Sequence, residues 1–351
     1  MKTIKNYNIY IFISTFTRNI IDIYSIIYLY QKGLSIKEII SIYALTYFIG
    51  YFISMMSITI GNRIGYKYIL IISSIITSIT FYIIHKSNSI YLISLFLSLS
   101  MFTYHPIRHY YGIKLLKQKK QIGTTLIFIY LSSMLSSYLA INNIKIIYLV
   151  IISIIGIIPA LFIEKEKPHK ITKKTIPYQK LKFFFFDQFK IVFILLEPLY
   201  LYLIANNISY VGVFNIFLTF SSIICIYLLS NKINISKNYK YINVLFTLIL
   251  IIKLNTYNKN LLLIIAILEG IGIKTNELVS TMNLYNVKKI DEGYIIMSEK
   301  IFCVIRSFIL SLIYFLPFSL KTNLYILIIG IFILSFQYKK DTLTWVSYQY
   351  S

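Results

Sequence analysis

Charged side chains inside long apolar runs are the residues of this sequence best suited to chemistry. The main candidates are Arg18, Asp22, Glu197, Glu269 and Arg306. An ionised group near the centre of a bilayer is costly unless it is paired or hydrated, so each one is a candidate for binding a substrate or an ion. The two glutamates are also candidates for carrying a proton, because a carboxyl group held away from water favours its protonated form.

Each of these candidates also has a purely structural interpretation. Arg18 and Asp22 are four residues apart, so on a helix they share one face and suit a structural ion pair as well as a substrate contact. Glu197 and Glu269 suit a role in a cavity, which we favour, or packing pairs with Arg306 or with a group on another helix.

The composition is that of a polytopic membrane protein. Hydrophobic residues make up 58% of the 351 residues and charged residues only 13%, and the mean hydropathy is +0.73. A soluble chain of this length needs more polar surface. The formal net charge of +23 comes from basic residues in loops between apolar runs, so we exclude nucleic acid as a partner and expect a lipid bilayer instead.

Apolar runs of membrane-spanning length place the charges inside a bilayer. About 20 helical residues cross roughly 30 Å of hydrocarbon. We therefore expect an all-α polytopic membrane protein with about 12 transmembrane helices in two six-helix bundles. The runs are residues 8–30, 38–60, 68–85, 90–107, 122–141, 145–163, 186–206, 208–230, 241–257, 260–280, 298–317 and 323–338.

A basic segment, residues 164–182, divides these runs six and six. We interpret it as a cytoplasmic linker between an N-terminal bundle, residues 1–163, and a C-terminal bundle with a short cytoplasmic tail, residues 183–351. Many secondary transporters consist of two such bundles, with the substrate site between them at the bilayer midplane. The alternative is a polar loop with no domain meaning.

The distribution of basic residues predicts the orientation in the membrane. Loops expected in the cytoplasm carry most of the lysines and arginines, which is the positive-inside pattern. We therefore expect a multi-pass protein of the cytoplasmic (inner) membrane with both termini in the cytoplasm. The expected external loops hold Lys32, Lys37, Lys86, Lys145, Lys253, Lys259 and Lys321.

A short basic hairpin, Ile60–Lys67, separates the second and third runs. Its glycines, Gly61 and Gly65, favour a tight turn between closely packed helices. Arg63 and Lys67 mark this side of the protein as cytoplasmic.

The hairpin resembles the loop signature of the major facilitator superfamily, which is approximately Gly-x-x-x-Asp-Arg-x-Gly-x-Lys-x-x-Leu. Arg63, Gly65, Lys67 and Leu70 match this signature, whereas Asn62 stands where an acidic residue is usual. The resemblance implies that Asn62, Arg63, Gly65 and Lys67 form a gating loop.

The resemblance also implies a monomeric secondary active transporter that works by alternating access without a cofactor. In that family the first, fourth, seventh and tenth helices line a central cavity. Here the first, seventh and tenth runs carry Arg18 with Asp22, Glu197 and Glu269, respectively. We therefore expect transport of a small molecule or peptide coupled to protons through Glu197 or Glu269, with export slightly preferred over import.

Enzymatic function is disfavoured by the motifs. The sequence has no Gly-x-x-x-x-Gly-Lys-Ser/Thr loop, no Gly-x-Ser-x-Gly elbow and no His-Glu-x-x-His helix. Cys225 and Cys303 lie in apolar runs without a Cys-x-x-Cys or histidine cluster, so we expect buried thiols and no metal site. A membrane-embedded glycan polymerase or acyltransferase is the alternative, but the expected external loops are short and carry lysine rather than arginine or histidine.

Two further features have interfacial interpretations. His105 and His109 suit a place near lipid headgroups, which we favour, or a proton relay. The run Phe183–Phe186 suits an aromatic belt at the membrane surface rather than a ligand site.

Overall fold

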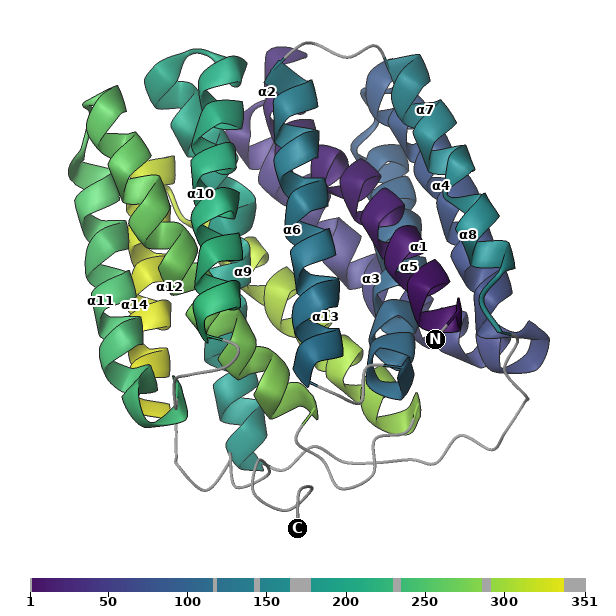
Figure 1. The fold of residues 1–351 in the computed structure, drawn as a ribbon. Coiled ribbons are helices and arrows are strands. Elements are labelled where there is room, and N and C mark those ends of the chain that lie inside the picture. Colours follow the sequence, from purple (N-terminus) through teal and green to yellow (C-terminus); the bar gives the residue numbers. More distant parts are fainter. Residues whose placement is uncertain are drawn as a thin grey trace. The chain divides into compact units, whose positions relative to one another are not determined.

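The computed structural model describes residues 2–115, 119–141, 146–164, 178–229, 235–285 and 292–337, and these residues form helices without strands (Figure 1). The contacts divide the chain into two compact units. The first is Met1–Thr175 with Asp291–Pro317, and the second is Ile176–Ile290 with Phe318–Ser351.

The helices of the first unit follow the first six apolar runs, with one helix added from late in the chain. They are α1 (Lys2–Asn19), the π-helix η1 (Ile20–Tyr24), α2 (Ser25–Gln31), α3 (Ile36–Ile64), α4 (Tyr66–Lys86), α5 (Ile90–Leu115), α6 (Lys119–Ile141), α7 (Ile146–Ile155), α8 (Ile157–Leu161) and α13 (Glu292–Phe315). The helices of the second unit are α9 (Tyr178–Ala205), α10 (Ile208–Leu229), α11 (Ile235–Asn255), α12 (Lys259–Tyr285) and α14 (Leu320–Gln337).

The same packing order recurs in the two units. In the first, α3 and α4 both pack on α5, while α7 packs on α4 and α8 on α1. In the second, α10 and α11 both pack on α12, while α14 packs on both α11 and α9. The order is the same for these helices but not for α6 and α13: α6 packs on α1, whereas α13 packs on α3.

The all-helical fold class is confirmed, and several helices are apolar enough to span a membrane; the count of twelve spans in two bundles stays a prediction. Each of the twelve apolar runs is mostly helical where the structure describes it. Five helical segments of the described residues are both long and apolar enough to cross a membrane: Ile36–Ile64, Tyr66–Lys86, Ile90–Gly112, Leu181–Ala205 and Ile208–Leu228. The first run is interrupted by the π-helix, and the sixth is divided between α7 and α8 at Gly156.

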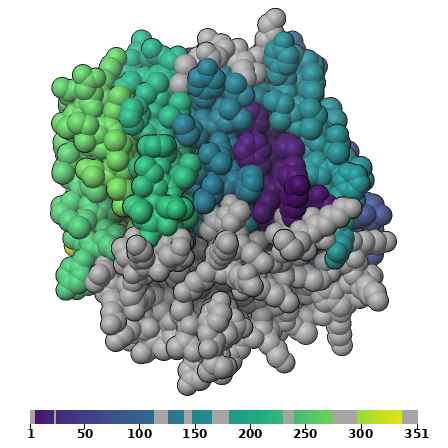
Figure 2. Space-filling model, viewed as in Figure 1, coloured from purple at the N-terminus to yellow at the C-terminus, as the bar shows by residue number. Residues whose placement is uncertain are grey.

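Polar hydroxyls face inwards and large apolar side chains face outwards. On α4, Ser73, Thr77 and Thr80 are buried, whereas Ile75 and Ile79 are exposed. The threonine hydroxyls donate to carbonyls one turn earlier, so their burial leaves no donor unpaired. Many other large apolar side chains are exposed, among them Phe48, Phe220 and Ile264. Figure 2 shows the side chains on one face of the molecule, coloured by residue number. Small residues inside and large apolar ones outside are the arrangement expected of helices packed in lipid.

Helix α13 belongs to the first unit by its contacts, whereas the sequence places residues 298–317 in the C-terminal bundle. It packs mainly along α3 and also meets α5. The hydroxyl of Ser307 donates to the Ala44 carbonyl at 3.0 Å, and Lys300 lies 5.2 Å from the centroid of the Tyr51 ring. Ser307 and Ala44 are 263 residues apart, so chain order could not reveal this pairing.

The hairpin between α3 and α4 depends on its two glycines. Gly65 ends α3 and begins α4 with φ at +110°, a conformation that side-chain-bearing residues rarely adopt. Gly61 lies within α3, and a Cβ there would overlap the ring of Tyr66. The expected tight turn is therefore confirmed, with one glycine needed for the turn and the other for close packing.

We expect Gly65→Ala to destabilise the first unit by about 1–3 kcal/mol, the usual cost of forcing a non-glycine residue into such a conformation. The measurement is the thermal unfolding midpoint of the purified protein in detergent. Ile64→Ala is the control, because Ile64 is adjacent but exposed. Equal midpoints for the two variants would contradict the role assigned to Gly65.

Candidate functional site

Three charged side chains meet in the interior of the second unit. The ammonium group of Lys253, on α11, lies 2.7 Å from Glu269 Oε2, on α12. The same ammonium group also contacts Glu197 Oε1, on α9. Lys253 and Glu269 are fully buried and Glu197 nearly so. We call Glu197, Lys253 and Glu269 the buried triad.

Aromatic rings complete the surroundings of the ammonium group. Lys253 Nζ lies 4.5 Å from the centroid of the Phe214 ring and 5.8 Å from that of Phe193. Ring faces attract a cation, so these rings stabilise the lysine in its charged form. When all three groups of the triad are ionised, two carboxylates face one ammonium and one negative charge is left over.

Close helix packing fixes Glu269 in place. A Cβ at the next residue, Gly270, would overlap Ser221 and the Leu218 carbonyl of α10, and a Cβ at Gly272 would overlap Phe246 of α11. The Ser222 hydroxyl also donates to the Gly270 carbonyl at 3.1 Å. Only glycine lets the backbone of α12 approach both neighbours this closely.

Glu197 and Lys253 are brought together by the pairing of α9 with α11. The hydroxyl of Tyr200, one turn after Glu197, donates at 2.9 Å to the carbonyl of Leu254, the residue after Lys253. This bond holds α9 against α11 at the level of the triad. Pro198 follows Glu197 within α9 and has no N–H for the helix ladder.

The assignment of Lys253 to an external loop is wrong. Lys253 was expected among the external lysines because it lies near the end of the run 241–257, but in the structure it is buried within α11. One local signal was available: Lys253 lies between Ile252 and Leu254, before the polar segment that starts at Asn255. Glu197 and Glu269 therefore both pair with Lys253, a group on another helix. A packing pair of this kind was one of the two interpretations given for these glutamates.

Arg18 is the centre of a separate polar network in the first unit. It is buried, and its guanidinium donates to the carbonyl and hydroxyl of Ser100 on α5 and, at 2.6 Å, to the hydroxyl of Ser73 on α4. The guanidinium carbon lies 4.1 Å from the centroid of the Tyr104 ring. The side chain of Asp22 lies outside the described residues, so the expected pairing with Arg18 stays a prediction; the π-helix begins at Ile20, between them.

Arg306 lies in the first unit, on α13, and is half-buried. Its guanidinium carbon lies 5.2 Å from the centroid of the Tyr47 ring and 5.8 Å from that of Phe302. Glu299 lies two turns before Arg306 on α13, and its Oε1 is 3.5 Å from His109 Nε2 of α5. This contact between helices was missed because Glu299 stands at the edge of its apolar run.

The gating-loop candidates lie on the hairpin of the first unit, and the buried triad lies in the second. Asn62 and Lys67 are half-buried and Arg63 is exposed. Lys67 Nζ lies 5.3 Å from the centroid of the Tyr68 ring. A gating role for these residues stays a prediction.

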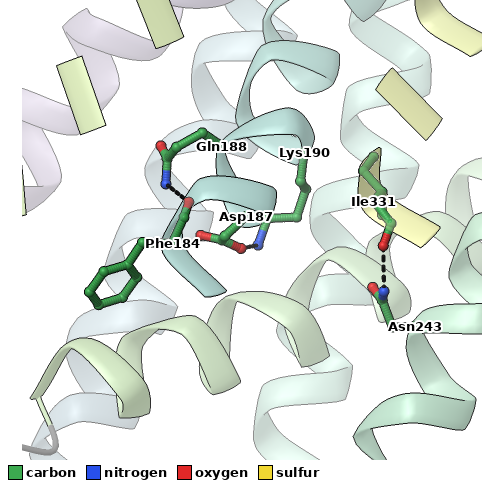
Figure 3. A network of polar contacts seen from close by, with 6 residues as sticks. All are labelled: Phe184, Asp187, Gln188, Lys190, Asn243 and Ile331. Carbon is green, nitrogen blue, oxygen red and sulfur yellow. Dashed lines mark hydrogen bonds and ion pairs between the residues drawn. The ribbon is translucent and has the colours of Figure 1, made fainter. Parts of the chain in front are cut away.

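A second buried ion pair lies on α9, two turns before the triad. Lys190 Nζ donates to Asp187 Oδ1 at 2.7 Å, and both side chains are buried (Figure 3). In the same region the Asn243 side chain of α11 donates at 2.8 Å to the Ile331 carbonyl of α14 (Figure 3). This pair was not predicted, because both charges stand at the beginning of the run 186–206.

The cysteines are buried as expected, whereas the aromatic belt at Phe183–Phe186 stays a prediction. Cys225 and Cys303 are both buried and reduced. Phe183 and Phe184 are buried, whereas Phe185 and Phe186 are half-buried and pack edge to face. Among the described residues no group of histidine, cysteine and acidic side chains is placed to hold a metal ion.

We expect Lys253→Met to destabilise the protein by about 3–5 kcal/mol, the usual cost of breaking a buried ion pair by removing one partner. Two buried carboxylates are then left without a cation. The triple variant Lys253→Met/Glu197→Gln/Glu269→Gln should recover part of the loss, because it removes all three charges. Thermal unfolding in detergent measures both, with the exposed Lys86→Met as control. A single variant as stable as that control would contradict the buried triad.

Arg18→Lys should destabilise the first unit by about 1.5–3 kcal/mol although it keeps the charge. A lysine cannot reproduce the forked hydrogen bonds to Ser73 and Ser100 or the stacking on Tyr104. Arg63→Lys, at an exposed position, is the matched control and should change stability by less than about 0.5 kcal/mol. Similar unfolding midpoints for the two variants would show that the Arg18 network does not stabilise the unit.

No protein-family model matches the chain, and no curated protein matches it. The resemblance to the major facilitator superfamily therefore continues to rest on the hairpin motif and on the arrangement of apolar runs, and it stays a prediction.

Proposed function

We propose that the protein is a proton-coupled secondary active transporter of the cytoplasmic membrane. It would move a small molecule or peptide by alternating access, with export slightly preferred. In this proposal twelve transmembrane helices form two six-helix bundles, both termini lie in the cytoplasm, and the chain is related to the major facilitator superfamily.

The buried triad is the observation that carries this proposal. Its two carboxylates come from α9 and α12 and share one ammonium group from α11, away from water. An unpaired buried charge costs several kcal/mol, so the surplus negative charge favours uptake of one proton. Ionisable residues placed in this way inside a membrane protein mark proton relays and ion pathways.

Protonation of one glutamate would change how the three helices hold together. It takes the net charge of the triad from −1 to zero and weakens one of the two contacts to Lys253. The neutral triad is easier to enclose in an apolar environment, while the charged triad favours contact with water. A proton gradient can therefore bias a rearrangement of α9, α11 and α12.

The recurring packing order supports the layout of two related bundles. Apart from α6 and α13, the two units pair their helices in the same chain order, as two repeats of one bundle would. Internal repeats with a site near the bilayer midplane are typical of secondary transporters. The Arg18 network of the first unit and the triad of the second occupy helices at matching positions in this order.

The substrate class follows from the side chains of both units. Arg18 offers a buried guanidinium beside hydroxyls and Tyr104, and the triad offers carboxylates beside Phe193 and Phe214. Each unit, taken by itself, holds a charged group next to aromatic rings, which supports an amphipathic small molecule or a short peptide as the proposed substrate.

The test is accumulation of labelled organic cations, organic anions and short peptides in inside-out vesicles, with and without an uncoupler. We expect at least one compound to accumulate in a gradient-dependent manner, and Glu197→Gln and Glu269→Gln to abolish that accumulation. Glu38→Gln is the control, because it removes an exposed carboxylate and keeps a residue suited to the helix cap at Ser35. If no compound responds to the gradient, or if both triad variants transport normally, the proposal is wrong.

A further inference from the structure

We infer that Lys253 is a built-in cation that competes with the proton, and that Glu197 is the carboxylate at which the two exchange. This inference rests on the proposed function and specifies its ion site. It follows from differences between the two glutamates, which contact the same ammonium group but differ in burial and in the rigidity of their helices.

Burial separates the two carboxylates. The side chains of Glu269 and Lys253 have no exposed surface, and Glu269 Oε1 has no hydrogen-bond partner among the described residues. The Glu197 side chain keeps 7% of its surface exposed. A proton from water therefore reaches Glu197 first, and Glu269 stays with Lys253.

The helices that carry the two carboxylates also differ in rigidity, and this difference again favours Glu197 as the site of exchange. Close contacts of Gly270 with α10 hold the backbone of α12 beside Glu269. Glu197, in contrast, precedes Pro198, whose missing N–H leaves the Ile194 carbonyl without its usual helix partner. Helices bend at such positions, so the part of α9 that carries Glu197, before Pro198, can move while the Tyr200 bond after Pro198 and Glu269 stay fixed.

The exchange is a simple proton transfer. A proton from the aqueous phase binds a carboxylate oxygen of Glu197, and the ionic contact between Glu197 and Lys253 breaks. Lys253 keeps its three ammonium hydrogens and its bond to Glu269. Loss of the proton restores the contact with Lys253, so no other reactant is needed.

The other charges on the described side chains of these helices have partners of their own or are exposed. Lys259 of α12 donates to the Ala205 carbonyl of α9, two turns after Glu197, Lys240 of α11 lies over the ring of Phe336, and Lys182 of α9 is exposed. Helix α10 carries no charged residue, and the single charge of α14, Lys321, lies at its beginning against Tyr257. On α9 itself, Asp187 and Lys190 form their own pair. The Tyr200 hydroxyl is bound to the Leu254 carbonyl. Lys253 and Glu269 are therefore the charges that control Glu197.

The experiment is labelling of the full-length protein in detergent with dicyclohexylcarbodiimide, which reacts with protonated carboxyl groups in apolar surroundings. Labelled residues are identified by mass spectrometry between about pH 5 and about pH 9, a range that covers shifted carboxyl groups. We expect labelling at Glu197 that is lost as the pH rises, and none at Glu269.

The Lys253→Met variant tests the competition. Without the ammonium group, labelling of Glu197 should persist to pH values about 1–3 units higher than in the unaltered protein, the usual effect of a neighbouring opposite charge. Lys190→Met is the matched control, because it removes a buried lysine of the same unit from another carboxylate. If Lys253→Met does not fold, the variant Lys253→Arg, which keeps the charge, should retain the labelling range of the unaltered protein.

Three results would overturn the inference: labelling of Glu269 instead of Glu197, labelling of Glu197 that does not depend on pH, or equal effects of Lys253→Met and Lys190→Met. None of them requires a substrate, so the outcome is separate from the vesicle assay. The inference can fail while gradient-dependent transport is observed, and the exchange can be observed in a protein that moves none of the compounds tested.

Discussion

The pairing of buried charge is the constraint on which the second unit depends. Lys253 lies away from water between two carboxylates, and its removal would leave both without a cation. Because the three groups come from α9, α11 and α12, satisfying their charges also fixes how these helices meet. The bond from Tyr200 to the Leu254 carbonyl and the close approach at Gly270 hold the same helices at the same level.

The first unit meets the same constraint with different chemistry. Arg18 is buried among hydroxyls, a backbone carbonyl and the face of Tyr104. Threonine hydroxyls on α4 and α5, such as those of Thr77 and Thr103, also bond to carbonyls of their own helices, so these buried donors are satisfied. A neutral hydroxyl network around one cation is rigid, whereas a triad with surplus charge can respond to a proton. The two units therefore suit different roles in the proposed transport cycle.

The hairpin and the buried triad contribute different information. The hairpin carries the residues that resemble a transporter family, and its geometry is explained by Gly65 at positive φ and Gly61 packed against Tyr66. Nothing in that geometry selects an ion or a substrate. The triad carries no family motif, but its charges and burial favour the binding of a proton. The functional proposal therefore depends more on Lys253, which has no counterpart in the motif, than on the loop that suggested the family.

The sequence by itself determined the helical class, the positions of the helices and three of the important buried charges. These are local properties: an apolar run of about 20 residues becomes a helix in lipid, and a charge within it stands out. The tertiary structure decided that Lys253 pairs with Glu197 and Glu269, that Asp187 pairs with Lys190 in a buried position, and that α13 packs along α3. Burial of a charge near the end of a run, and its choice of partner, depend on how helices distant in the sequence pack, and no local pattern records that.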